Sequence, residues 1–302
     1  MTLDILGHPF LVTALCASLV AAVAGGMMGS YIVAKRIVFL SGSISHAVLG
    51  GMGFFLWLKR TYAVSWANPI LGALIAAIIS AMLLSWIHSK YKEREDTLIA
   101  ALWSTGMAIG VVFIALTPGY NVELTNFLFG NILWATPGDI MLLGMLDLFL
   151  LAGTLLFHKR FLAICFDEEQ ALMQGIAVQP LYTLLLCMVA ISVVLLIQVV
   201  GAILVIAILT IPSAIASMLS NRLSLIMVIA SAIGCLFSMG GVLASYELNW
   251  PPGATISLIA ALFYLITLLS YPKARRLFLG KQPYKTKEPP LKCAKAIDEL
   301  SP

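Results

Sequence analysis

Long, unbroken runs of apolar residues constrain this sequence more than any other feature. Two examples are Ile70 to Trp86 and Tyr182 to Leu209, and a helix of roughly 20 apolar residues crosses the hydrocarbon core of a bilayer. In lipid, every backbone N–H and C=O group needs a partner within the protein, so only helices and closed barrels span membranes. Since a barrel would show short segments of alternating polarity, the runs predict an all-α, polytopic integral membrane bundle.

The composition agrees with this fold class. Of the 302 residues, 61% are hydrophobic and only 11% are charged, whereas a soluble domain has roughly 25% charged residues. The five cysteines are scattered, and no two form a CxxC pair. They are therefore interpreted as small apolar side chains in a membrane core.

Nine transmembrane spans are expected from the apolar runs. The run from 181 to 220 is too long for one helix, and we divide it near Gly201, where a turn forms easily. Without that division the count is eight. The predicted transmembrane domain covers residues 1–271, and a polar segment follows at 272–302. The spans are predicted at 10–34, 37–58, 68–88, 97–117, 138–158, 181–199, 201–220, 223–246 and 253–271.

Lys and Arg residues predict which ends of the spans face the cytoplasm. Nine spans threaded from an outside N-terminus bring five basic groups to one side and leave only Lys59 and Arg60 on the other. The C-terminal segment is then cytoplasmic as well. The five groups are Lys35 and Arg36; Lys90, Lys92 and Arg94; Lys159 and Arg160; Arg222; and Lys273, Arg275, Arg276 and Lys281.

Two connecting segments differ from simple loops. The outer one, at about 119–137, is too short and polar to span, but its middle is apolar enough to be re-entrant or to lie along the interface. The inner one, at about 160–180, has three acidic residues before Gly175, a pattern that suits a helix of two turns. Either this is an ordinary amphipathic loop, or it docks on a cytoplasmic partner. The acidic residues are Asp167, Glu168 and Glu169.

Motifs for catalysis are absent from the sequence. The P-loop pattern GxxxxGK[ST] is not matched, because Gly280-Lys281 lacks the upstream glycine and the hydroxyl, and HExxH is also missing. Ser43 and Ser45 lie near His46, but no nucleophile motif or second base accompanies them. A membrane-embedded enzyme is therefore disfavoured, and the chain itself is expected not to be an enzyme.

His46 lies near the middle of the second span, where an ionisable residue is a functional hypothesis. Helical spacing puts Gly42, Gly50 and Gly53 on the same face. Small residues let helices approach closely, so we expect this face to point into the bundle and to pack on another helix. A neutral imidazole is a good ligand for Zn²⁺, Fe²⁺ or Mn²⁺. The alternative, a histidine hydrogen-bonded to a neighbouring helix, stays open.

Three acidic residues are further candidates. Asp147 lies between leucines in the fifth span, where a carboxylate must face a cavity, be paired or stay protonated. A role in an ion pathway and a structural hydrogen bond are equally open. Glu123 and Glu247, at predicted outer ends, are candidates for attracting cations to an external mouth, although most exposed acidic residues are simply solvated.

Five segments between about residues 35 and 260 resemble, in order, the motifs of the ABC-3 permeases, the membrane subunits of bacterial zinc, manganese and iron importers. Their number and order, rather than any single match, carry the resemblance. The segments are Phe39 to Gly51; Leu128 to Leu133 (LFGNIL); Phe166-Asp167-Glu168 with Gly175-Ile176; Val200 to Val205 with Ile211 to Ala214; and Ser245-Tyr246 with Pro251 to Ala254.

The resemblance implies the permease subunit of an ATP-driven importer in the bacterial inner membrane. Divalent zinc or manganese, with iron close behind, would pass a mid-membrane site that includes His46 by alternating access, with no permanently bound cofactor. The implied partners are cytoplasmic ABC ATPase subunits, an extracytoplasmic metal-binding protein, a second permease copy or paralogue and the lipid bilayer, and not nucleic acid. The loop from Phe166 to Gly175 would be the helix that couples to the ATPase.

The sequence departs from this family at two positions. Many members have an aspartate four residues before the histidine, where this chain has Gly42, and Asn249 replaces the aspartate of the last motif. Asp147 is our hypothesis for the residue that supplies the missing charge. A stand-alone secondary carrier or channel for a cation is the alternative function, and its uptake would follow an ion gradient instead of ATP.

Overall fold

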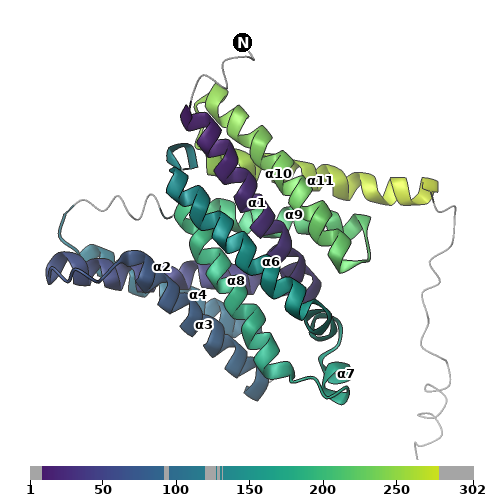
Figure 1. Cartoon of the computed structure of the whole chain (residues 1–302), viewed down its shortest axis with the longest axis horizontal. Coiled ribbons are helices and arrows are strands. Elements are labelled where there is room, and N and C mark those ends of the chain that lie inside the picture. Colours follow the sequence, from purple (N-terminus) through teal and green to yellow (C-terminus); the bar gives the residue numbers. More distant parts are fainter. Residues whose placement is uncertain (1–8, 92–94, 120–126, 128–129, 131, 279–302) are drawn as a thin grey trace, which may run out of the picture. The chain divides into compact units, whose positions relative to one another are not determined.

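The structure is a computed structural model in which all regular secondary structure is helical over the residues that it describes, namely 9–91, 95–119, 127, 130 and 132–278. Of the described residues, those up to Tyr264 form one compact unit, and those from Leu265 onwards form a second. The elements (Figure 1) are α1 (Pro9–Lys35), α2 (Val38–Thr61), α3 (Pro69–Tyr91), α4 (Glu95–Leu116), the 3₁₀ helix η2 (Ile132–Trp134), α6 (Pro137–Phe166), α7 (Glu168–Met173), α8 (Val178–Val200), α9 (Ala202–Leu219), α10 (Leu223–Leu248) and α11 (Pro252–Phe278).

Nine helices within the described ranges are long and apolar enough to cross a membrane. The predicted polytopic helical bundle is therefore confirmed, with nine spans rather than eight. The division near Gly201 decides the count: α8 ends at Val200 and α9 begins at Ala202, while Gly201 between them has φ +82°. Glycine adopts this left-handed backbone conformation without steric cost, so two apolar helices follow each other with a single residue between them.

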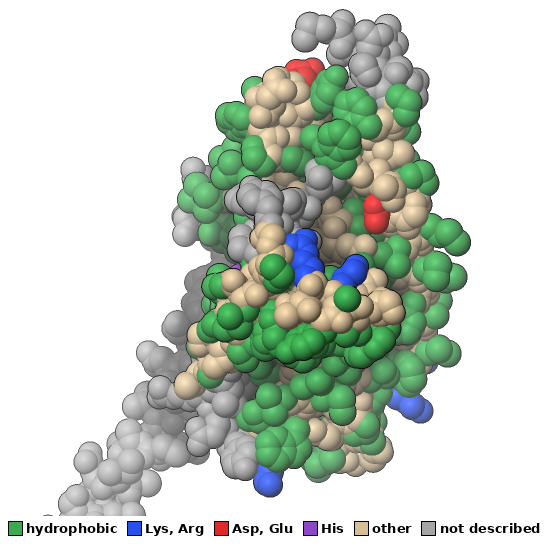
Figure 2. Space-filling view, turned by 90° about the vertical axis from the view of Figure 1, so that its left-hand side faces the viewer, with side chains coloured by type: hydrophobic (Ala, Val, Ile, Leu, Met, Phe, Trp, Pro, Cys, Tyr) green, Lys and Arg blue, Asp and Glu red, His purple; other side chains and the backbone are tan. Residues whose placement is uncertain are grey.

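The described surface is largely apolar, with few charged side chains on the face that Figure 2 shows. Val228, Leu155 and Leu156 are 67%, 73% and 77% exposed. An apolar patch of this kind is rare on a soluble monomer, but it matches the hydrocarbon of a bilayer. The surface is that of a multi-pass membrane protein.

Helix α1 packs against α6, α9 and α10. Glycines make these contacts close. A Cβ atom added at Gly26 would lie 2.4 Å from the backbone nitrogen of Ser231 in α10, and one at Gly29 would lie 1.8 Å from the carbonyl oxygen of Leu209 in α9. Because lipid provides no hydrophobic force between helices, close backbone packing of this kind holds them together.

A second group of helices consists of α2, α3 and α4. Helices α2 and α3 meet at two glycines, since a Cβ atom at Gly51 would lie 2.2 Å from the carbonyl oxygen of Gly72. Helix α8 contacts α3 and α2 in this group, and also α6, α1 and α9. The largely buried α8 therefore joins the two groups.

Helix α6 continues beyond the end predicted at residue 158 and reaches Phe166. At its start, the hydroxyl of Thr136 accepts a hydrogen bond from the Asp139 backbone N–H (3.3 Å), and the Asp139 carboxylate accepts one from the Thr136 N–H (2.9 Å). This capping box fixes the first turn. The inner connection consequently begins later than predicted and consists of α7 and its flanking residues.

Two predicted segments lie largely outside the described residues. Of the outer connection at about 119–137, the structure describes only Gly119, Phe127, Gly130 and the part from Ile132 onwards. The C-terminal segment predicted at 272–302 begins inside α11, which continues to Phe278, and its remainder is not described.

Candidate functional site

The glycine face of α2 packs against α4. A Cβ atom at Gly50 would lie 3.0 Å from the carbonyl oxygen of Gly106, and one at Gly53 would lie 2.8 Å from that of Gly110. Gly42, on the same face, is different: a Cβ atom there would meet only the ring of Trp103, at 3.5 Å. Gly50 and Gly53 thus permit the close approach of α2 and α4, whereas Gly42 leaves room for a larger side chain.

His46 lies on this face between Gly42, where α4 leaves space, and Gly50, where α4 is in close contact. Its ring stacks on Trp103 of α4, with the ring centroids 4.4 Å apart and the planes at 14°. The Nδ1 atom is buried and has no hydrogen-bond partner in the structure. The stack fixes the orientation of the imidazole and leaves a nitrogen lone pair or N–H available for a ligand.

The inner connection forms the two-turn helix that its sequence predicts. Asp167 caps α7 by accepting a hydrogen bond from the Gln170 backbone N–H (3.0 Å), and Gly175 follows the helix with φ +77°. Ala171 of this helix is buried, whereas three apolar side chains in the helix and just before it are exposed. The exposed side chains are Phe166 (71%), Leu172 (65%) and Met173 (89%). Exposed side chains of this type are typical of a docking surface.

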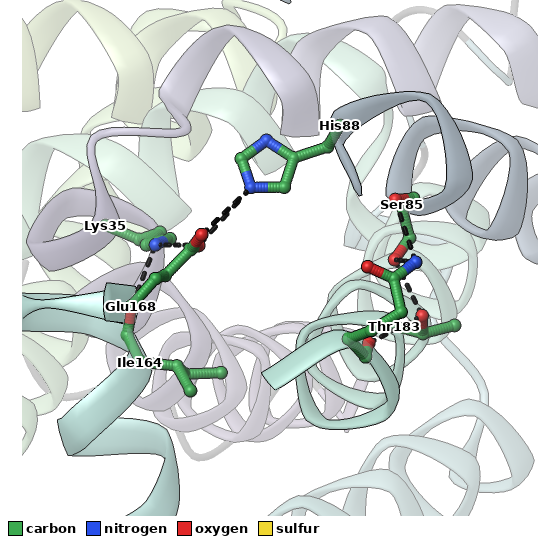
Figure 3. A network of polar contacts seen from close by, with 7 residues as sticks. Lys35, Ser85, His88, Ile164, Glu168 and Thr183 are labelled. Atoms are coloured by element: carbon green, nitrogen blue, oxygen red, sulfur yellow. Dashed lines mark hydrogen bonds and ion pairs between the residues drawn. The ribbon is translucent and has the colours of Figure 1, made fainter. Parts of the chain in front are cut away.

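Glu168, the first residue of α7, is held by two helices of the bundle. Lys35, at the end of α1, forms an ion pair with its Oε1 atom, and His88, near the end of α3, approaches the carboxylate to 3.3 Å (Figure 3). Lys35 also donates a hydrogen bond to the Ile164 carbonyl of α6 (2.8 Å). We call Lys35, His88 and Glu168 the inner cluster.

The electrostatics of the inner cluster stabilise the ionised carboxylate. The hydrogen bond with His88, together with the hydrogen bond and charge of Lys35, lowers the pKa of Glu168 from 4.5 to about 2, against a smaller opposing effect of burial. Tyr182 of α8 completes the surroundings, with its ring 4.6 Å from that of His88 and 5.7 Å from the Lys35 ammonium. The cluster therefore connects α7 with α1, α3 and α8.

Asp147 of α6 lies apart from His46 of α2. The Oδ1 atom of Asp147 is buried without a hydrogen-bond partner, and its electrostatic neighbour is the Cys235 thiol of α10. Helix α2 packs mainly on α3 and α4, and α6 mainly on α1 and α8. Hence the structure does not bring Asp147 and His46 together within one chain. Glu247 is exposed near the end of α10, and Glu123 lies outside the described residues.

Two of the family-like segments meet in the structure. Gly130, from the LFGNIL segment, has φ +68°, and a Cβ atom there would lie 2.3 Å from the backbone of Val200. Val200 begins the segment that contains Gly201 and the turn from α8 to α9. Glycine at position 130 is therefore required both by the backbone conformation and by this contact.

No group of three or more His, Cys, Asp or Glu side chains suited to a metal ion occurs in the described part of the chain. His46 therefore does not belong to a preformed cluster of such side chains within the described residues.

Sequence reasoning did not select Lys35 and His88 as functional residues. It used Lys35 only as one of the charges that orient the spans. A signal was present: the first and third spans were predicted to end on the side that also carries the acidic inner connection. Opposite charges at one membrane face favour pairing, but only the folded chain shows which residues pair.

Comparison with known proteins agrees with this architecture. A Chlamydia pneumoniae protein named as a probable metal transport system membrane protein is 50% identical over 252 residues, which are 83% of this chain and 86% of that protein. The manganese transport system membrane protein MntC of Listeria monocytogenes is 30% identical over 91% of this chain and 95% of its own. In the solved structure of PsaBC from Streptococcus pneumoniae in complex with Fab, one chain has a TM-score of 0.78 at 29% identity, covering 91% and 97%.

Residues 7–271 match the ABC 3 transport family. The chain belongs to that family, and the resemblance inferred from its motifs is confirmed. It is thus a multi-pass membrane permease of the ABC transporter class.

Proposed function

We propose that this chain is the membrane-spanning subunit of an ATP-driven bacterial importer of divalent metal ions. The observation that carries the proposal is the imidazole of His46, which is stacked on Trp103 and keeps a buried Nδ1 atom without a partner. Within a membrane such a nitrogen is costly unless a ligand uses it. It occupies the position at which the family resemblance implies a metal ligand.

Manganese is the leading substrate in this proposal. The relative from Listeria monocytogenes is named for manganese transport, and an imidazole with oxygen donors suits Mn²⁺. Zinc and iron are the other candidates, because imidazole binds all three ions. Asp147 contributes a negative charge at a separate position of the path, and Glu247 and Glu123 attract cations at its outer mouth.

The cytoplasmic partner in this proposal is an ABC ATPase that docks on α7. The exposed side chains of Phe166, Leu172 and Met173 support this assignment, because they offer an apolar surface next to the ionic inner cluster. The five basic groups orient α7 and the C-terminal segment towards the cytoplasm of a bacterial inner membrane. An extracytoplasmic metal-binding protein delivers the ion, and a second permease copy or paralogue completes the pore.

The inner cluster connects α7 to the proposed metal site at His46. Movement of α7 acts through Glu168 and His88 on α3. Helix α3 contacts α2 at Gly72 and Gly51, where the two backbones are too close for either helix to slide freely along the other. Helix α2 carries His46. Contact alone is not coupling, but this route uses rigid helices and one ionic joint.

The test is uptake by the complete importer, purified with its ATPase and reconstituted into proteoliposomes. We expect Mn²⁺ uptake that requires ATP and external binding protein, and that persists when the proton gradient is collapsed. Zn²⁺ and Fe²⁺ are measured in parallel to rank the substrates. Uptake that follows the gradient without ATP would instead establish the carrier or channel, and uptake of none of the three ions would refute the metal assignment.

A further inference from the structure

A groove of about 770 Å³ lies between α1, α6 and α10. Its walls are mainly apolar, with Val23 and Met27 from α1, Leu151 and Leu155 from α6, and Val228 from α10. The volume falls within the roughly 300–1,000 Å³ that is usual for sites that bury a small-molecule ligand. Leu155 and Val228 are also largely exposed, so the groove opens on the lipid-facing surface of this unit.

One end of the groove is cationic. Lys159 and Arg160 of α6 line it there, and both side chains are exposed. Neither forms an ion pair with any residue that the structure describes. Ser224 and His158, which share a hydrogen bond of 3.2 Å, lie at the same end. The groove therefore has an apolar length and a polar, positively charged end.

The length of the groove matches one leaflet of a bilayer. From Leu151 to Arg160, α6 rises about 14 Å at 1.5 Å per residue. Half of the hydrocarbon core is about 15 Å. The basic end thus lies at headgroup level when the apolar end lies near the midplane. By the distribution of Lys and Arg, this is the cytoplasmic leaflet.

We propose that this groove binds one anionic phospholipid, with an acyl chain along α1, α6 and α10 and the phosphate between Lys159 and Arg160. Both halves of the ligand are matched: exposed apolar walls receive the chain, and two cations without an ion pair among the described residues receive the charge. A basic pocket between membrane helices on the cytoplasmic side is a physically favourable site for such lipids. The site is separate from His46 and from the inner cluster.

The lipid would act close to α7, the helix on which the ATPase is proposed to dock. Arg160 lies in the part of α6 that leads to Phe166, and α7 begins two residues later. His158, at the polar end, also contacts the Tyr31 hydroxyl of α1 at 3.1 Å. A bound headgroup would therefore fix the ends of α1 and α6 where they approach the inner cluster.

The first test measures lipid binding to the purified full-length chain in mild detergent by native mass spectrometry. Phosphatidylglycerol is titrated against phosphatidylcholine. We expect preferential binding of phosphatidylglycerol, weakened about fivefold by Lys159→Gln and about thirtyfold by Lys159→Gln with Arg160→Gln, because each cation near a phosphate contributes that much. Lys59→Gln removes the same charge from an exposed lysine outside the groove and is expected to leave binding unchanged.

The second test addresses the acyl chain. Val228→Trp fills the groove from an exposed position and keeps both cations, so we expect it to weaken phosphatidylglycerol binding as well. Leu258→Trp, at a 62% exposed position of α11 outside the groove, is the matched control. Inorganic phosphate and glycerol phosphate, which lack acyl chains, are added as competitors and are expected not to displace the lipid.

Four results would overturn the proposal. Equal binding of the two lipids, or binding unaffected by the double substitution, would remove the role of the cations. Displacement by inorganic phosphate would show a simple anion site. If Val228→Trp converts a dimer into monomers without changing lipid binding, the groove is an interface between two copies of the chain. Melting temperature and elution profile of each variant show whether it is folded.

Discussion

The inner cluster and the His46 site are both polar positions in an apolar bundle, but they differ in how their groups are satisfied. The Glu168 carboxylate has Lys35 and His88 as partners within the chain. The buried Nδ1 of His46 has none. A paired charge holds elements together, whereas a buried polar atom without a partner is open to a ligand. We therefore interpret the inner cluster as a joint between helices, and His46 as the proposed binding site.

Replacing His46 by alanine is the strongest test of this difference between the two positions. We expect His46→Ala to reduce metal uptake about 100-fold, since loss of even an outer-shell partner costs 10–100-fold in metal affinity. The melting temperature should change little, because Nδ1 makes no hydrogen bond and only the Trp103 stack is lost. Uptake and thermal unfolding are measured on the same preparation.

Ser104→Ala is the control for that substitution. Ser104 is an exposed neighbour of Trp103 on α4, and its hydroxyl bonds only the Ala101 carbonyl of its own helix. Its uptake should equal that of the wild type. Normal uptake of manganese, zinc and iron by His46→Ala would contradict the site assignment.

Glu168→Gln tests the other side of the comparison. The substitution keeps the shape of the side chain but removes the ion pair with Lys35, and a charge-assisted hydrogen bond is worth about 1.5–3 kcal/mol. We expect uptake to fall about tenfold while the assembled complex continues to hydrolyse ATP. Uptake per ATP hydrolysed is the measurement. Glu169→Gln, at the exposed neighbouring carboxylate, is the control, and an equal loss there would contradict a specific joint.

Asp147→Asn examines another buried polar atom that has no hydrogen-bond partner among the described residues. A unit charge contributes at least about 1 kcal/mol to a nearby cation even in a water-like environment, so we expect uptake to fall at least fivefold. The structure separates Asp147 from His46, and the effects of Asp147→Asn and His46→Ala should therefore be additive in a double variant. Unchanged uptake in Asp147→Asn would remove Asp147 from the path.

The inner cluster and His46 also show which features can be predicted from the sequence and which cannot. Apolar runs determine spans locally, and Gly201 marked the division that sets their number at nine. The two-turn helix at Glu168 followed from its acidic start and Gly175. The partners Lys35 and His88 come from helices distant in sequence, and the stacking of Trp103 on His46 depends on how α2 and α4 pack. Such contacts have no local sequence pattern.

The pH dependence of stability should distinguish the inner cluster from ordinary acidic residues. Because the folded-state pKa of Glu168 is about 2 instead of 4.5, its contribution is complete above pH 4.5 and is lost as the pH falls towards 2. We expect wild type to melt about 5 °C above Glu168→Gln at pH 7, for a contribution of about 2 kcal/mol. The gap should persist to pH 5 and close below it. A gap that closes between pH 7 and pH 5 would assign the stabilisation to a different group.

Among substitutions on the glycine face of α2, we expect the smallest loss of stability at Gly42. Gly53→Ala is expected to cost about 1–3 kcal/mol by overpacking, because its Cβ atom would lie 2.8 Å from the Gly110 carbonyl. Gly42→Ala should be nearly neutral, since its Cβ atom would meet Trp103 at an ordinary 3.5 Å. Melting temperatures of the two variants provide the measurement, and equal losses would contradict the distinction.

If Gly42→Ala is tolerated, packing does not require glycine at this position. Gly42→Asp then introduces a carboxylate one helical turn before His46, at the position where many members of the family have one. A carboxylate oxygen as a second donor beside the imidazole nitrogen should tighten manganese binding, because carboxylate ligands suit that ion. In the absence of any gain, the donors that complete the His46 site would have to come from elsewhere than the α2 face, and the second permease subunit would be the next place to search.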